Sequence, residues 1–484
     1  MMRSTWLNPE IKDADDLKIT PRTRWSFASG GVTRGVIENA HYFVLVYYSQ
    51  VLGLSPYLAG LAFGIGLAFD AITDPLVGYL SDNTRSRLGR RHPYLYASVV
   101  PLSLAYFLLW HPPPSIQAEM SLFFYLLICN SALNLSTTLF IVPAYATVAE
   151  LTNDYEERTR LLARFHSMMS VVGNGMSVAM YAIWLTPTPQ IVDGILNVEG
   201  YKQAGVFGTL LMATSILVFA IGLHRHIPHM KTHSAPASPS PRQFYRQIYD
   251  VFRIPALRAI LTSGVLYWAG SGTYAALWVY IYSYFWEFTS HQIALIVIPM
   301  ILGGLILPPI ISGLATGREK KRVAVFGMLA ASLVNVTPIA LRLIGVFPEN
   351  GTPVLFWIML TAGFFETWLF LVFDVCWRSM TSDITEQIEL KTGRRNEGVI
   401  MSTVTFTSKC SYAIGTLVAG TLLSLIAFPT ETAVGSVTPD TIFNLGLLYG
   451  PVVLAFYLLA GYAISRYDIS RDDFVDTVST LDQL

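Results

Sequence analysis

The chain has 484 residues, of which 53% are hydrophobic and 13% are charged, and its formal net charge at pH 7 is zero. Because a typical soluble domain carries about 25% charged residues, this composition indicates an integral membrane protein. A net charge of zero gives no electrostatic support for binding nucleic acid, so we expect no such partner.

Residues 1–24 mix acidic and basic groups without an apolar core, so we predict an N-terminal tail rather than a cleaved signal peptide. Apolar windows of about 20 residues, the length that crosses a bilayer, then recur along the chain. They lie at 27–50, 57–80, 94–111, 121–149, 163–185, 204–223, 255–285, 290–315, 322–344, 353–381, 398–427 and 440–465. These windows predict an all-α membrane protein with twelve transmembrane helices, six in residues 25–223 and six in residues 254–466, followed by a tail over 467–484.

The second window contains two carboxylates, Asp70 and Asp74. An Asp at the centre of a membrane helix costs roughly 2.5–3.5 kcal/mol on insertion scales, so the pair is expected to face the protein interior. The i, i+4 spacing places both on one helix face with Thr73 beside them. This concentration of oxygen donors suits a small cation, such as sodium, or exchange of a proton.

Residues 224–253 separate the two sets of windows and are rich in Pro and Ser, which predicts a flexible, non-helical linker. Its histidines include His224 and His226, but no carboxylate or cysteine joins them at metal-ligand spacing. We therefore expect a solvated linker here.

Lys and Arg are concentrated in alternate loops, after the second, fourth, sixth, eighth and tenth windows. The opposite loops at 51–56, 112–120, 286–290 and 428–439 contain neither residue, and 186–203 contains only Lys202. The positive-inside rule therefore predicts that both termini and the linker are cytoplasmic in a multi-pass protein of the inner or plasma membrane. Twelve crossings around a central cytoplasmic linker predict the major facilitator arrangement of two six-helix bundles.

The stretch after the second window resembles the glycoside–pentoside–hexuronide:cation symporters, the family that includes melibiose permease. The resemblance is carried by Asp70, Asp74, Pro75, Gly78, Asp82, Thr84, Ser86, Arg87, Gly89, Arg90 and Pro93. Further matches are Glu157-Arg158-Thr159-Arg160, Asp383 and Lys409.

The resemblance implies cation-coupled uptake by alternating access. It implies that Asp70 and Asp74 bind the cation, that Thr138 completes the site, and that Lys409 contributes to coupling. Of the family's sugar-binding positions, Tyr145 supplies an aromatic platform, but Arg34 and Ile141 replace the two acidic residues and Asp374 replaces a tryptophan. These departures argue against galactoside recognition.

Two further pairs of charges lie at i, i+4 spacing inside predicted helices, Arg34 with Glu38 and Asp374 with Arg378. Each pair either makes burial tolerable as a local ion pair or presents its Arg to an anionic substrate such as a uronide. His166 is a candidate to assist binding. Glu366 is a separate candidate for the substrate site or a proton path.

Charged residues at the predicted cytoplasmic ends have two interpretations. Asp82 with Arg85 or Arg87, and Asp383 or Glu386 with Arg394 or Arg395, can form ion pairs that gate the inner side. Alternatively, the basic residues only satisfy the positive-inside rule.

The sequence therefore predicts a secondary symporter, driven by Na⁺ or H⁺, that imports a sugar, glycoside, uronide or related organic solute. A transporter of lysolipid or another amphiphile is the main alternative, and a non-transporting membrane protein is a weaker one. No nucleophile or metal motif of a membrane enzyme is found, so we expect no enzymatic activity and no cofactor beyond the coupling ion. The expected partners are a small-molecule substrate and membrane lipid, and we expect a monomer.

Overall fold

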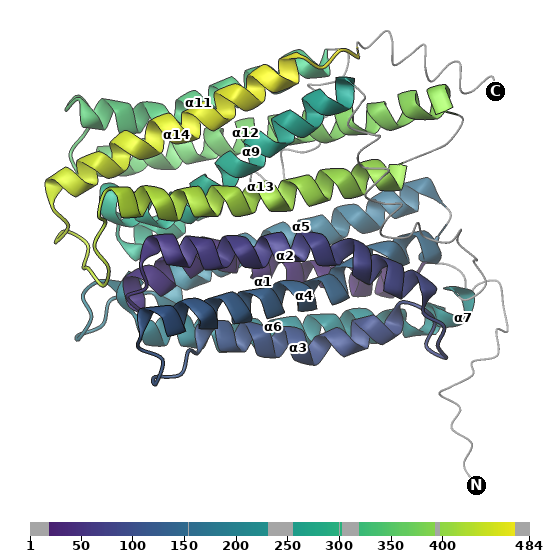
Figure 1. Ribbon diagram of the computed structural model, residues 1–484. Helices are drawn as coiled ribbons and strands as arrows, with labels where there is room; N and C mark the ends of the chain where they lie inside the picture. Colours follow the sequence, from purple (N-terminus) through teal and green to yellow (C-terminus); the bar gives the residue numbers. More distant parts are fainter. Residues whose placement is uncertain are drawn as a thin grey trace.

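The computed structural model describes residues 19–152, 154–230, 255–299, 301–302, 319–392 and 397–469. Within these ranges the regular secondary structure is helical, and the described residues contain no strand. Figure 1 shows two groups of helices side by side, the N-terminal group mainly in purple and blue and the C-terminal group in teal (α9), green and yellow. The described part of the chain thus has the all-α class that the apolar windows predict.

The N-terminal half is built from six long helices. They are α1 (Pro21–Val46), α2 (Pro56–Asn83), α3 (His92–Trp110), α4 (Glu119–Leu151), α5 (Tyr155–Ala179) and α6 (Val198–Leu223). Short turns of helix, η2 (Tyr47–Val51), η3 (Met180–Trp184), η4 (Gly194–Leu196), η5 (His224–His226) and α7 (Ile227–Met230), extend or connect them. The described long helices of the C-terminal half are α9 (Pro255–Tyr280) with its extension η6 (Ile281–Phe285), α11 (Lys320–Leu343), α12 (Pro353–Thr392), α13 (Glu397–Leu425) and α14 (Pro439–Ser465).

The predicted windows coincide with these helices, apart from 290–315, of which Ser290–Pro299 is described and helical. Seven of the described helices are long and apolar enough to cross a membrane. The starts of α1, α2 and α14 follow local chemistry: Thr20, Ser55 and Thr438 each accept a hydrogen bond from a backbone N–H of the first turn, and a proline follows each of them.

The prediction of a non-helical linker from residue 224 is wrong for its first residues, since 224–230 are helical. His226 is buried and its Nε2 lies 3.1 Å from Thr23 Oγ1, while His224 Nδ1 lies 2.9 Å from the Tyr96 hydroxyl. The Pro- and Ser-rich composition that suggested a solvated linker belongs to the segment beyond these histidines. Residues 231–253 lie outside the described part of the chain.

The same turn closes the first helix of each half. After α1, Leu52 N–H donates to Tyr47 O and Leu54 N–H to Tyr48 O, at 3.1 and 2.9 Å. After α9, the bonds recur from Trp286 to Ile281 O and from Phe288 to Tyr282 O, at 2.9 and 3.1 Å. Gly53 and Glu287 adopt positive φ at the equivalent place, 75° and 52°. When the two turns are aligned by these bonds, Gln50 of the first corresponds to Tyr284 of the second. The Tyr284 hydroxyl donates to Gln50 Oε1 at 3.3 Å, so the two turns contact each other.

The two halves meet most closely along α2 and α13. Glycines make this approach possible: a Cβ on Gly420 would lie 2.3 Å from the Pro56 carbonyl oxygen, and one on Gly60 would lie 2.9 Å from the Thr416 carbonyl oxygen. Because backbone atoms occupy that space, a side chain at either position must push the helices apart.

We expect Gly420→Ala to lower the thermal stability of the purified protein by about 1–3 kcal/mol, the usual effect of overpacking. Gly175→Ala is the matched control, because a Cβ there meets nothing within 4 Å. Replacing that helical glycine is expected to be neutral or slightly stabilising. Equal unfolding temperatures for the two variants would contradict close packing of α2 on α13.

Candidate functional site

Two carboxylates of α2, one buried and one partly buried, face a hydroxyl of α4. The Asp70 side chain is 2% exposed and the Asp74 side chain 20% exposed. Thr138 contacts both of them, lying within hydrogen-bonding distance of Asp70 Oδ1 and 2.8 Å from Asp74 Oδ1. The i, i+4 spacing on α2 and the neighbouring turn of α4 therefore gather five hard oxygen atoms, the donor type that a small cation prefers.

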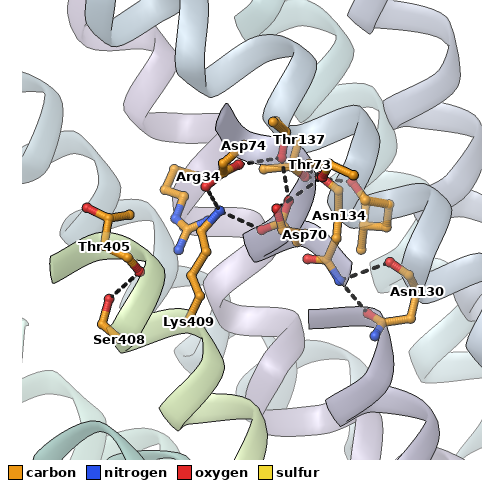
Figure 2. Close-up of polar contacts among 12 residues, drawn as sticks. Arg34, Asp70, Thr73, Asp74, Asn130, Asn134, Thr137, Thr405, Ser408 and Lys409 are labelled. Atoms are coloured by element: carbon orange, nitrogen blue, oxygen red, sulfur yellow. Dashed lines mark hydrogen bonds and ion pairs between the residues drawn. The ribbon is translucent and has the colours of Figure 1, made fainter. Parts of the chain in front are cut away.

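Lys409 of α13 reaches across to this pair from the other half of the protein. Its Nζ donates to Asp70 Oδ2 at 2.5 Å and to Asp74 Oδ2 at 2.6 Å. Figure 2 shows the ammonium group between the two carboxylates, with Arg34 alongside. With both carboxylates ionised, two negative charges and one positive charge leave the cluster a net charge of −1.

Polar side chains on α2 and α4 hold this cluster in place. Thr73 Oγ1 donates to the Asp70 carbonyl at 3.0 Å, so its hydroxyl proton is used by the helix backbone. Asn134 donates to the Asn130 carbonyl at 3.0 Å (Figure 2). Asn130 in turn donates to the Phe63 carbonyl of α2 at 3.0 Å. The sequence reasoning missed this amide ladder, although Asn130, Asn134 and Thr138 recur at the four-residue spacing of one helix face.

His41 is a second residue that the sequence reasoning missed. Its ring lies 5.1 Å from the ring of Phe63 on α2 and 5.8 Å from that of Tyr412 on α13. It therefore lies where α1 meets α2 and α13, the helices that carry Asp70, Asp74 and Lys409. The sequence did contain a sign of its importance, because a histidine inside an apolar window and three residues after Glu38 is an ionisable group within a membrane helix.

The two predicted charge pairs form as local ion pairs. Arg34 Nε lies 3.0 Å from Glu38 Oε1 on α1, and Arg378 Nε lies 2.8 Å from Asp374 Oδ2 on α12. The Arg378 side chain nevertheless stays 60% exposed, and that of Glu38 stays 41% exposed. Each pair uses one guanidinium nitrogen in its ion pair, so further N–H donors remain to bind another group.

The other two predicted substrate residues lie close to these pairs. The rings of Tyr145 on α4 and His166 on α5 are 6.0 Å apart and nearly parallel. Both interact electrostatically with Glu38 and Arg34 of their own half and with Arg378 of the other half. The structure thus gathers all six predicted substrate residues where the halves face each other.

Two of the predicted gating residues, Asp82 and Asp383, pair with a basic residue of the neighbouring helix. Asp82 pairs with Arg91 at 2.6 Å, because the turn after α2 brings Arg91, the residue just before α3, back over the end of α2. Asp383 pairs with Lys320 at 2.8 Å. Both observed pairs join neighbouring helices within one half. Glu386, Arg394 and Arg395 lie outside the residues whose side chains are described.

Comparisons with known proteins agree with this architecture. The model of the MFS/sugar transport protein family matches residues 26–471. The putative glycoside/cation symporter YagG of Escherichia coli (strain K12) is 24% identical over 464 residues, covering 93% of each chain. The sodium-dependent lysophosphatidylcholine symporter 1-A of Danio rerio is 33% identical over 163 residues, 33% of this chain and 30% of that protein.

Solved structures share the fold at low sequence identity. A crystal structure of a POT peptide transporter in complex with alafosfalin has a TM-score of 0.65 and 12% identity, covering 92% of this chain and 94% of that one. A family model that matches nearly the whole length, two groups of membrane-length helices and this shared fold lead to one conclusion. The chain belongs to the MFS/sugar transport protein family and is a multi-pass membrane transporter of the major facilitator fold.

Proposed function

We propose that the protein is a symporter in which a monovalent cation, Na⁺ or H⁺, drives uptake of a sugar, glycoside, uronide or related small organic solute. The observation that carries this proposal is the contact of Lys409 with both Asp70 and Asp74. It connects the two halves through a buried cluster whose net charge of −1 is cancelled by a single monovalent cation.

Binding of that cation would weaken the electrostatic attraction between α2 and α13 across the two halves. A Na⁺ ion would be held by the carboxylates of Asp70 and Asp74 and the Thr138 hydroxyl, and it would supply the positive charge that the cluster lacks. With the cation bound, these carboxylates no longer depend on Lys409 alone, so the α2–α13 contact is weakened and the halves can rearrange. Thr73 contributes mainly by fixing the backbone at Asp70.

The energy available through this coupling is sufficient for uptake. Moving one charge through about 100 mV is worth about 2.3 kcal/mol, which corresponds to roughly 50-fold accumulation. By linkage, the cation and the substrate must raise each other's affinity by the same factor.

For the substrate, we propose the region between Arg34, Glu38, Tyr145 and His166 on one half and Asp374 and Arg378 on the other. Two guanidinium groups with unused donors suit a carboxylate, and carboxylates beside an aromatic ring suit hydroxyl groups. A uronide combines both features. The buried Asp374 Oδ1 has no hydrogen-bond partner among the described residues and is a further acceptor.

We propose that the charged end of the bundle, where Arg91 pairs with Asp82 and Lys320 with Asp383, is cytoplasmic, with both termini on that side. At the opposite end, Gln50 Nε2 donates to the Pro429 carbonyl at 2.9 Å and Val434 N–H donates to Asp193 Oδ2 at 2.7 Å. These bonds join the halves. They support a conformation closed toward the outside.

A lysolipid symporter is the second candidate, supported by the similarity to the Danio rerio protein. The charged residues that face each other across the halves favour the polar solute, because an acyl chain would have to be buried against them. A membrane enzyme has no supporting observation.

The proposal is tested by a thermal-shift screen of purified protein against sugars, uronides, organic anions and lysophospholipids, each in sodium and in choline buffer. A ligand that binds only the folded state raises the unfolding temperature. We expect a uronide or related polar solute to do so, and to a greater extent in sodium or at low pH. Counterflow of the labelled hit in proteoliposomes then distinguishes transport from binding. Stabilisation by lysophospholipid alone would support the second candidate, and no dependence on either cation would refute coupling.

A further inference from the structure

A second intramembrane carboxylate site lies in the C-terminal half, around Glu366 of α12. The Glu366 side chain is 5% exposed. Its Oε1 accepts a hydrogen bond from Asn335 Nδ2 of α11 at 2.8 Å, and Tyr274 of α9 lies nearby. Asn335 is held in turn by the Tyr449 hydroxyl of α14, which donates to its Oδ1 at 3.3 Å.

Within the described ranges, the groups that face Glu366 are uncharged. Those that interact with it electrostatically are all tyrosines of the helices packed around it: Tyr42 on α1, Tyr274 on α9, Tyr282 on η6, and Tyr449 and Tyr457 on α14. The other carboxylates in the middle of the described helices are paired with a cation. Asp70 and Asp74 contact Lys409, Asp374 contacts Arg378, and Glu38 contacts Arg34. Glu366 has no such partner among the described residues.

An ionised carboxylate without a cation is strongly disfavoured in a buried, apolar environment. One neutral donor, the Asn335 amide, offsets only part of the lost hydration, so protonation is the simplest way for Glu366 to remain buried. From this geometry we infer that Glu366 binds a proton, as an ion site separate from the Asp70–Asp74 pair.

The position of Glu366 suits such a role. It lies 13 residues after Pro353, the first residue of α12, and Asp70 lies 14 residues after Pro56, the first residue of α2. Both helices begin at the end opposite the charged one, so at 1.5 Å per residue the two sites lie at similar depth, roughly 20 Å along their helices. Each half then carries its own ion site, and Tyr42 connects the Glu366 shell to the N-terminal half. When the halves rearrange, water gains or loses access to the residues around Glu366. Access of water favours the ionised carboxylate and releases the proton, and exclusion of water favours its uptake.

The test is infrared spectroscopy of the purified protein across a pH series, because a neutral carboxylic acid has a carbonyl stretch that an ionised carboxylate lacks. We expect wild type to show this band at neutral pH and Glu366→Gln to lose it. The same loss is expected when Glu366→Gln is added to Asp74→Asn, so the result does not depend on the proposed cation site. Persistence of the full band in both Gln variants would overturn the inference.

A second variant tests the shell and covers the case in which Glu366→Gln fails to fold. The amide of Asn335 donates to the carboxylate and so favours its ionised form. In Asn335→Ala this donor is gone. We therefore expect the carboxylic acid band to be present at neutral pH, as in wild type, and to disappear only at a higher pH than in wild type. A titration unchanged from wild type, or displaced to lower pH, would contradict the assignment. The rise in unfolding temperature caused by sodium is measured in parallel and is expected to persist in Glu366→Gln and in Asn335→Ala. If wild type itself shows no such rise, that result contradicts the proposed sodium site and leaves the inference about Glu366 unaffected.

Discussion

Lys409→Met is expected to destabilise the protein strongly in sodium-free buffer and to make its stability depend on sodium. The side chain is 18% exposed and its ammonium group lies 2.5 and 2.6 Å from two carboxylates. Removing one partner of a buried ion pair typically costs about 3–5 kcal/mol. Here the change also leaves two negative charges facing each other. The measurement is the unfolding temperature in choline and in sodium buffer.

Sodium should recover much of the lost stability in Lys409→Met, because the cluster then has a net charge of −2 and attracts the cation more strongly. The expected gain from sodium is therefore larger in this variant than in wild type. Lys202→Met, on α6 and away from the cluster, serves as the control and should respond as wild type does. An unfolding temperature for Lys409→Met that is unchanged in choline would show that the cross-half contact contributes little.

The opposite outcome is expected for Asp74→Asn, which should abolish the stabilisation by sodium. With Asn at this position, Asp70 and Lys409 cancel each other and no charge remains for a cation to neutralise. A site filled at 100 times its Kd stabilises a protein by about 2.7 kcal/mol, and this increment should disappear. The protein should still insert and fold, since Lys409 keeps Asp70 as its partner.

Cation-driven uptake of any substrate found in the screen should be lost together with the sodium response of Asp74→Asn. Asp440→Asn removes an exposed carboxylate in the first turn of α14 and provides the matched control. Retention of full sodium- or proton-driven uptake by Asp74→Asn would refute the assignment of the cation site.

The fold was predictable because each crossing must be apolar over a fixed length, so eleven of the twelve windows map directly onto described helices. The carboxylate pair was predictable for the same reason, since two acids one turn apart stand out in an apolar segment. Thr138 and Lys409 were reached through the family resemblance. Nothing in the spacing of the sequence relates position 409 to position 70.

Other parts of the site depend on tertiary geometry. Arg91 reaches Asp82 because the turn over residues 84–91 folds back over the end of α2. The composition of that loop does not show which of its arginines will lie beside Asp82. His41 was overlooked because its importance comes from the packing of α1 against α2 and α13. Glu366 was visible as an intramembrane acid, but its tyrosine shell comes from three parts of the chain that are widely separated in sequence: α1, α9 with its extension η6, and α14.

The matched turns after α1 and α9 have a consequence for the origin of the chain. The same two backbone bonds recur 234 positions apart, and the next helix begins with a matching cap, as Ser55 Oγ accepts from Leu58 N–H and Thr289 Oγ1 from Gln292 N–H. Such correspondence at equivalent places is what duplication of a single six-helix unit would leave in a chain of two parallel repeats. On that view the two copies would have kept their turns and diverged in their charged residues, with an acidic pair beside α4 in one and a tyrosine-lined acid in the other.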